Sequence, residues 1–217
     1  MNQKKSFLPF VTALVLLLSS CIGVSSSIIL RGDGSGTISL EYRIPLALEA
    51  LGKLDGNAGW LTIPVGKADF ERTLDRLPGI RMISFSSKKD EKDLINRIGL
   101  EFSDMEALLP FLDATGQGAS FSRENGLSRL SLTLSEGLEN PDGELLTLLA
   151  SLAEGYKLEI SLSAPKEASL ALYTGRGKAL EAVPGGDLSG RGKQVSFRVP
   201  MAEVLSAREG LRLEIIW

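Results

Sequence analysis

The stretch TISLEYRI, residues 37–44, decides the fold class of this chain. Every second residue from Ile38 to Ile44 is apolar and the residues between them are polar, which is the period of a strand with one buried and one solvated face. A strand buried on both faces, as in a parallel sheet, would read as a continuous apolar run. The stretch therefore predicts an antiparallel sheet with one wet face.

Outward from this stretch, the same alternation recurs five times along the chain. It is found over residues 94–102, 129–134, 157–162, 195–199 and 211–217. Segments between these strands have the helical period instead, with one apolar stripe each. The expected helices cover residues 70–77, 105–112, 145–152 and 202–206. We therefore predict an α+β fold, in which helices pack on one face of an antiparallel sheet or sheets.

Boundary signals support these helices. Pro78-Gly79 follows the first, a capping box from Ser103 to Glu106 precedes the second, and Asn140-Pro141 opens the third.

Two arrangements of these elements compete. A β-α-β-β-α-β order occurs over residues 37–124 and again over 127–217, which suggests two ferredoxin-like units. However, Glu124-Asn125-Gly126 is a tight-turn signal that would pair the last strand of one unit with the first strand of the next. Because no Pro/Ser/Gly-rich linker separates the halves, we expect a single α+β ectodomain over residues 28–217. Its glycine-rich segment 165–193 is expected to be a mobile loop or loose hairpin.

The N-terminus has the features of an exported lipoprotein. Lys4 and Lys5 precede an apolar run over residues 7–18, which predicts a signal peptide over residues 1–20. Leu18-Ser19-Ser20 then leads into Cys21, the one cysteine of the sequence. This order resembles the lipobox of bacterial lipoproteins, and it implies that Cys21 is lipidated and becomes the new N-terminus. Residues 21–27 would form the lipidated end and a short tether.

Composition narrows the function. The 217 residues include no histidine, which removes the histidine-dependent nucleophile systems and every histidine-containing zinc site. There are 24 basic against 27 acidic residues, and loss of Lys4 and Lys5 with the signal peptide leaves 22 bases, a net charge of −5. Nucleic acid is therefore an unexpected partner, because phosphate binding requires clustered Lys and Arg. We expect no catalytic residues, no cofactor and no metal.

Two segments are candidate binding sites. Asp33-Gly34-Ser35-Gly36 looks like part of a calcium loop, but its first and twelfth ligand positions would be Arg31 and Tyr42, which cannot serve there. A glycine-rich hairpin explains the segment better. Trp60, in a glycine-rich stretch, is the candidate ligand-binding residue, although a tryptophan packed at the edge of the core is the simpler explanation. Four strand glutamates are expected on wet faces, namely Glu41, Glu101, Glu159 and Glu214.

The lipobox, the segment 33–37 entering an alternating strand, and the segment Val195–Pro200 together resemble the LppM-like lipoprotein family of bacteria. The resemblance implies a mixed α/β ectodomain in the cell envelope and an association with amphiphilic lipids. It implies no catalytic residues.

These observations predict a membrane-anchored envelope lipoprotein that faces the periplasm or the cell exterior. Its non-catalytic domain would bind an amphiphile or an envelope protein near the membrane. The alternatives are a structural or assembly subunit of an envelope complex and, less favoured, a histidine-free hydrolase.

Overall fold

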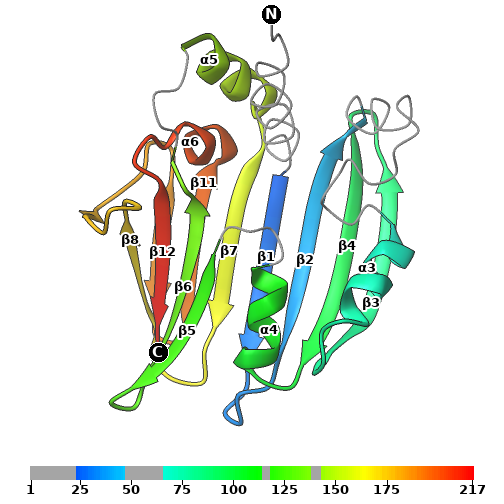
Figure 1. Cartoon of the computed structure of the whole chain (residues 1–217), viewed down its shortest axis with the longest axis vertical. Coiled ribbons are helices and arrows are strands. Elements are labelled where there is room, and N and C mark those ends of the chain that lie inside the picture. The colour runs from blue at the N-terminus through cyan, green and yellow to red at the C-terminus, as the bar shows by residue number, and fades with distance from the viewer. Residues whose placement is uncertain (1–22, 47–65, 114–117, 138–142) are drawn as a thin grey trace, which may run out of the picture.

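The computed structural model describes residues 23–46, 66–113, 118–137 and 143–217, and these are mostly β. Two open sheets contain the strands (Figure 1). The first has seven strands in the order β10 (Asp187–Arg191), β11 (Gln194–Pro200), β7 (Lys157–Ser163), β1 (Gly23–Leu30), β2 (Gly36–Pro45), β4 (Asp93–Phe102) and β3 (Ile80–Lys89). The second has five strands in the order β5 (Ala119–Glu124), β6 (Leu127–Ser135), β12 (Leu211–Ile216), β8 (Ser169–Tyr173) and β9 (Ala179–Leu180).

The strand order is not that of two ferredoxin-like units. β5 would complete the first unit beside β2, but it pairs with β6 in the other sheet. Strands β7 and β11, from the second half of the chain, join the sheet that holds β1 and β2. The reason is the turn at Asn125 and Gly126, both with positive φ, which closes the β5–β6 hairpin as the sequence predicted.

The N-terminal strand begins earlier than expected. β1 starts at Gly23, so residues 23–27, which were expected to form a tether, lie inside the sheet. β1 pairs with β2 antiparallel and with β7 parallel, and the other pairings among the described strands are antiparallel. Serine is a poor signal for a strand, but Ser25, Ser26 and Ser27 are held here by strands on both sides.

The predicted helices are present with small shifts. They are α3 (Lys67–Leu74), α4 (Met105–Leu112), α5 (Gly143–Leu152) and α6 (Met201–Ser206). The N-cap of α4 is Asp104 rather than Ser103, because the Asp104 carboxylate accepts a hydrogen bond of 2.7 Å from the Ala107 N–H. The expected cap at Asn140-Pro141 lies outside the described residues. None of the described helices is long and apolar enough to cross a membrane.

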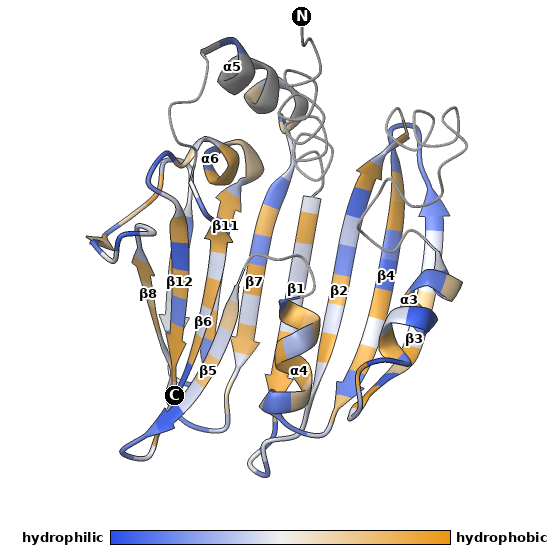
Figure 2. Ribbon diagram, viewed as in Figure 1, coloured by the Kyte–Doolittle hydropathy of each residue, from blue (hydrophilic) through white to orange (hydrophobic). Residues whose placement is uncertain are grey.

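One hydrophobic core joins the two sheets and the helices. Hydrophobic and hydrophilic residues alternate along several strands, as the bands in Figure 2 show, and the buried hydrophobic ones form this core. α4 contacts both β4 and β5, and α6 contacts β6, β7 and β11, so each of these helices bridges the two sheets. Ile38, Leu100, Phe197 and Leu130 are among the fully buried side chains at its centre.

The segment 165–193 is more regular than the sequence suggested. It contains β8, β9 and β10. β10 contains Gly190, and the backbone N–H of Ala168 donates to the Gly192 carbonyl at 2.8 Å. Of the two alternatives expected there, the mobile loop was wrong, because pairing with β11 and β12 orders the segment, whereas β8 and β9 do pair as a short hairpin.

Candidate functional site

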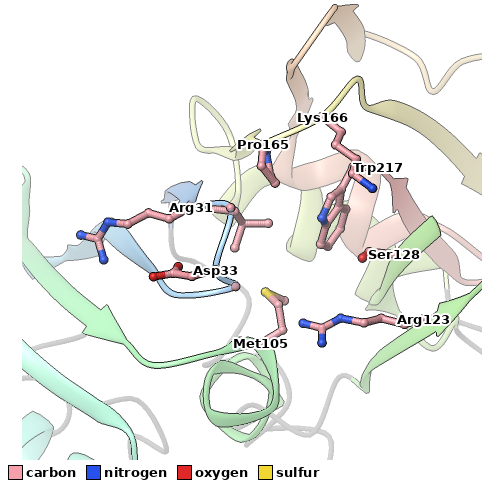
Figure 3. A pocket seen from close by; sticks show the side chains of 11 residues that line it. Arg31, Asp33, Met105, Arg123, Ser128, Pro165, Lys166 and Trp217 are labelled. Carbon is pink, nitrogen blue, oxygen red and sulfur yellow. The ribbon is translucent and has the colours of Figure 1, made fainter. Parts of the chain in front are cut away.

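A cavity of about 210 Å³ lies at the end of the molecule where β1 finishes. Its walls come from segments that are far apart in the sequence (Figure 3). They are residues 30–34, Met105, Arg123, Ser128, residues 165–166 and Trp217. The turn between β1 and β2 forms one wall, and the ends of β5, β6 and β12 form the opposite wall. The cavity is therefore assembled by both sheets.

The five-stranded sheet supplies the last row of residues on its inner face. Ser128 and Trp217 exchange backbone hydrogen bonds of 2.8 and 3.0 Å, and Arg123 is the partner of Ser128 on β5. The Trp217 side chain is buried, as is Met105 at the start of α4. These two side chains and Leu30 give the cavity an apolar floor.

Aromatic contacts fix one side of the cavity. The rings of Phe121 and Trp217 lie 5.9 Å apart and are stacked at 20°. The guanidinium of Arg123 lies 5.1 Å from the centre of the Phe121 ring, within the range of a cation–π interaction. Arg123 is thus held in place by an aromatic pair rather than by an acid.

The opposite wall, the turn after β1, is held by its own side chains. Asp33 accepts hydrogen bonds from the Ser35 hydroxyl at 2.7 Å and from the Ser35 N–H at 3.0 Å. These bonds hold the pKa of Asp33 below its ordinary value of 3.8. The hairpin expected at residues 33–36 is confirmed, and the Asp33 carboxylate is used within it.

Charge at the cavity is unevenly balanced. Arg31 donates to Glu101 at 3.4 Å and to the Ser35 hydroxyl at 3.1 Å, so its charge is paired on the outside of the sheet. Figure 3 shows the guanidinium of Arg31 directed away from Trp217. Arg123 and Lys166 make no ion pair with any residue in the described part of the chain. The cavity therefore presents two uncompensated cations beside an apolar floor.

No protein-family model matches this chain, and no curated protein matches it in sequence. Function is therefore inferred from the geometry of the site. The resemblance to the LppM-like lipoproteins stays a prediction.

A second cavity, of about 390 Å³, lies between the Pro78-Gly79 turn and the first turns of α4. Its Ser103 and Asp104 side chains already have partners. The Asp104 carboxylate caps α4 and also accepts a hydrogen bond of 3.0 Å from Ser103. This cavity offers a ligand fewer free polar groups than the first.

One expected wet-face glutamate is buried. Glu214 on β12 is 8% exposed, and it lies between Arg129 at 2.5 Å and Arg212 at 3.4 Å. The prediction was wrong because long arginine side chains from the same face cover the carboxylate. Two other glutamates, Glu41 and Glu101, are partly exposed and paired with arginines.

The two site residues proposed from the sequence, Cys21 and Trp60, lie outside the described residues. The cavity residues Arg123, Lys166 and Trp217 were not recognised. The one available signal was Trp217 at the end of an alternating strand, since a tryptophan in the last row of a sheet borders its open end. Across the described residues, no group of three or more acidic or cysteine side chains could hold a metal ion.

Proposed function

We propose that this chain is a lipid-anchored protein of the bacterial cell envelope whose β-rich domain binds a small ligand in the cavity bordered by Trp217. Anchoring is proposed at Cys21, by the lipobox. The domain is proposed to act as one ectodomain, since strands from both halves of the chain pair within both sheets.

The position of the cavity along β1 supports this function. Gly23, two residues after Cys21, begins β1, and Leu30 at its other end borders the cavity. Eight residues in a strand at about 3.3 Å each separate the two points by roughly 23 Å. An anchored domain would therefore hold the cavity away from the bilayer surface and open to the aqueous compartment.

The size of the cavity limits its ligand. An apolar cavity of about 150 Å³ is known to hold one benzene molecule. At about 210 Å³, this cavity admits a group the size of one ring, not the acyl chains of a whole lipid. The ligand is then a small molecule, the polar head of an amphiphile that has left the bilayer, or a side chain of an envelope protein.

A binding role is favoured over catalysis. Asp33 is the one carboxylate among the described residues that line the cavity, and its Oδ1 atom accepts two hydrogen bonds from Ser35. Acid–base chemistry with carboxylates needs a second group positioned against the first. The described walls of the cavity hold no such pair.

Two measurements test the proposal. The full-length protein is expressed in a bacterial host, and its mass is determined by mass spectrometry. Acylation at Cys21 is expected, and the Cys21→Ala variant should remain an unacylated precursor. Ser20→Ala, which keeps the small residue before the cysteine, is the matched control and should be processed normally. A mature wild-type protein without lipid would contradict the anchoring.

The second measurement is native mass spectrometry of the acylated protein after gentle extraction. We expect a small ligand to be retained by the wild type and lost from Trp217→Ala, with Tyr173→Ala, an aromatic substitution outside the cavity lining, as the control that should retain it. Recovery of the bare polypeptide mass from the wild type and from the control variant would contradict the binding function and favour a structural subunit.

A further inference from the structure

We propose that the cavity bordered by Trp217 binds an anionic group, a phosphate or carboxylate, on a ring-sized apolar moiety, and that Arg123 and Lys166 are its direct ligands. This inference rests on the proposed binding function and names the chemistry of the ligand. It does not depend on the lipid anchor.

The charged side chains around the cavity point in different directions. Of the three cations in its lining, Arg31 is paired with Glu101, a carboxylate that it shares with Arg81. The one acidic side chain of the lining, Asp33, is engaged by Ser35. In Figure 3 the charged ends of Arg31 and Asp33 lie away from Trp217, whereas Arg123 lies beside Met105 and Lys166 beside Trp217. The two unpaired cations thus border the apolar floor.

The Arg123 guanidinium lies close to the turn on the opposite side of the cavity. A Cβ placed on Gly34 would lie 3.5 Å from its Nη2 atom. Arg123 therefore spans the cavity from β5 to the turn between β1 and β2. The cation–π contact with Phe121 holds the guanidinium without using its hydrogen-bond donors, so these stay available to a planar anion.

The charge at the cavity is opposite in sign to the net charge of the whole chain. The full sequence has a net charge of −3, whereas the two charged side chains of the described lining that border the apolar floor, Arg123 and Lys166, are both cations. Like charges that converge on a partly enclosed site repel each other, and a bound anion relieves that repulsion. An anionic ligand is thus favoured over a neutral or cationic one.

The apolar floor of the cavity indicates what the anionic group is attached to. Leu30, Met105 and Trp217 are all buried and form the floor between the cations. A ring-sized moiety packed against them would bury its own apolar surface and gain free energy from that burial, which a bare ion would not. The anion is therefore expected to be attached to an apolar or planar group.

The experiment uses Trp217 as its own reporter. The chain has two tryptophans, so the full-length Trp60→Phe protein in detergent reports on Trp217 alone. Its fluorescence is followed during titration with phenyl phosphate, benzoate and phenol at constant ionic strength. We expect saturable changes with the two anions and at least roughly tenfold weaker binding of phenol, which shares the ring but lacks the charge.

Charge-removing variants then test the ligands. The double variant Arg123→Gln, Lys166→Gln should weaken phenyl phosphate binding by roughly tenfold or more. The matched control is Arg191→Gln, Lys178→Gln, which removes the same two charges from exposed positions outside the cavity lining. Equal weakening by both doubles would show a nonspecific charge effect and overturn the inference. Equal binding of phenol and phenyl phosphate would overturn it as well.

A final titration separates the two sources of the anion. Vesicles of phosphatidylglycerol are compared with soluble phenyl phosphate. A response to both is expected of a lipid head group that can enter the cavity, whereas a response to the soluble phosphate alone assigns the site to free ligands. If the ligand retained in native mass spectrometry is neutral and stays bound to the Arg123→Gln, Lys166→Gln protein, the anion inference fails while the binding function stands.

Discussion

The phenol of Tyr156 donates a hydrogen bond of 2.6 Å to Oδ1 of Asp93, 63 positions away in the chain. Asp93 is the first residue of β4 and is 6% exposed, whereas Tyr156 directly precedes β7. The Tyr156 ring passes close to the backbone at Gly23, where an added Cβ would lie 3.1 Å from its Cδ1 atom. This bond ties the beginnings of three strands together at the end of the sheet opposite the cavity.

Tyr156→Phe should lower the free energy of unfolding by about 1–2 kcal/mol, because the buried Asp93 carboxylate loses a donor while the ring is kept. Urea denaturation followed by circular dichroism measures the change. The control is Tyr173→Phe, which removes the phenol oxygen but keeps the ring that Arg212 contacts. An equal loss of unfolding free energy in both variants would show that the hydrogen bond from Tyr156 to Asp93 adds no particular stability.

Gly36→Ala should destabilise the domain by about 1–3 kcal/mol, since a Cβ there would lie 2.3 Å from the Ile29 carbonyl oxygen and 2.4 Å from Cζ of Phe102. Gly32→Ala in the same turn is the matched control, because no atom lies within 4 Å of its added Cβ. We expect the control to change stability by less than about 0.5 kcal/mol. Thermal unfolding of the two variants side by side decides the matter, and similar midpoints would contradict the close packing at Gly36.

Glu214→Gln should cost about 1–3 kcal/mol, because it leaves Arg129 and Arg212 close together without the carboxylate between them. Glu159→Gln removes a more exposed carboxylate, paired with Arg198 at 2.6 Å, and should cost no more than about 1 kcal/mol. The difference is measured by urea denaturation at two salt concentrations. A larger effect at Glu159 than at Glu214 would be inconsistent with the burial of Glu214.

Stability should fall with acid below the ordinary glutamate pKa of 4.5. Burial raises the pKa of Glu41, but hydrogen bonds from Arg97 and Arg43 outweigh it and the net pKa lies below 4.5. The hydrogen bond and charge of Arg81, helped by Arg31, lower the pKa of Glu101. A carboxylate with a depressed native pKa stabilises the fold above its unfolded pKa, and that contribution is lost as the pH falls through the native pKa.

The measurement is the urea midpoint between pH 7 and pH 3. The double variant Glu41→Gln, Glu101→Gln should lose less stability over the acid limb than the wild type. Glu181→Gln, which removes an exposed carboxylate, should follow the wild-type curve. A wild-type slope in the double variant would show that other groups carry the acid dependence.

Local patterns in the sequence predicted most of the elements. Alternation identified β2, β4, β6, β7, β11 and β12, and the leucine stripes identified the helices, because both depend on one buried face. Asn125-Gly126 predicted its hairpin because its turn requires positive φ at both positions. Alternation does not say which strands pair, so the division into two sheets was not predictable.

The cavity was missed for a similar reason. Arg123 and Lys166 look like ordinary exposed charges on their own segments. They acquire a role when the ends of two different sheets meet, and that meeting depends on tertiary pairing rather than on any local period. Trp217 by contrast could have been flagged, since its burial at the end of a strand follows from the alternation that begins at Leu211.

The parallel pairing of β1 with β7 sets an order of assembly. A chain made from its N-terminus can close the β1–β2 hairpin at once, but the second edge of β1 waits for a strand 134 positions later. Until then that edge is open to pairing with other chains, and the long loop slows its closure. Ser25, Ser26 and Ser27 occupy the centre of this waiting edge, where an apolar run would invite aggregation. The same serines that make β1 look like a linker in the sequence thus lower the risk that the nascent chain aggregates before β7 pairs with β1.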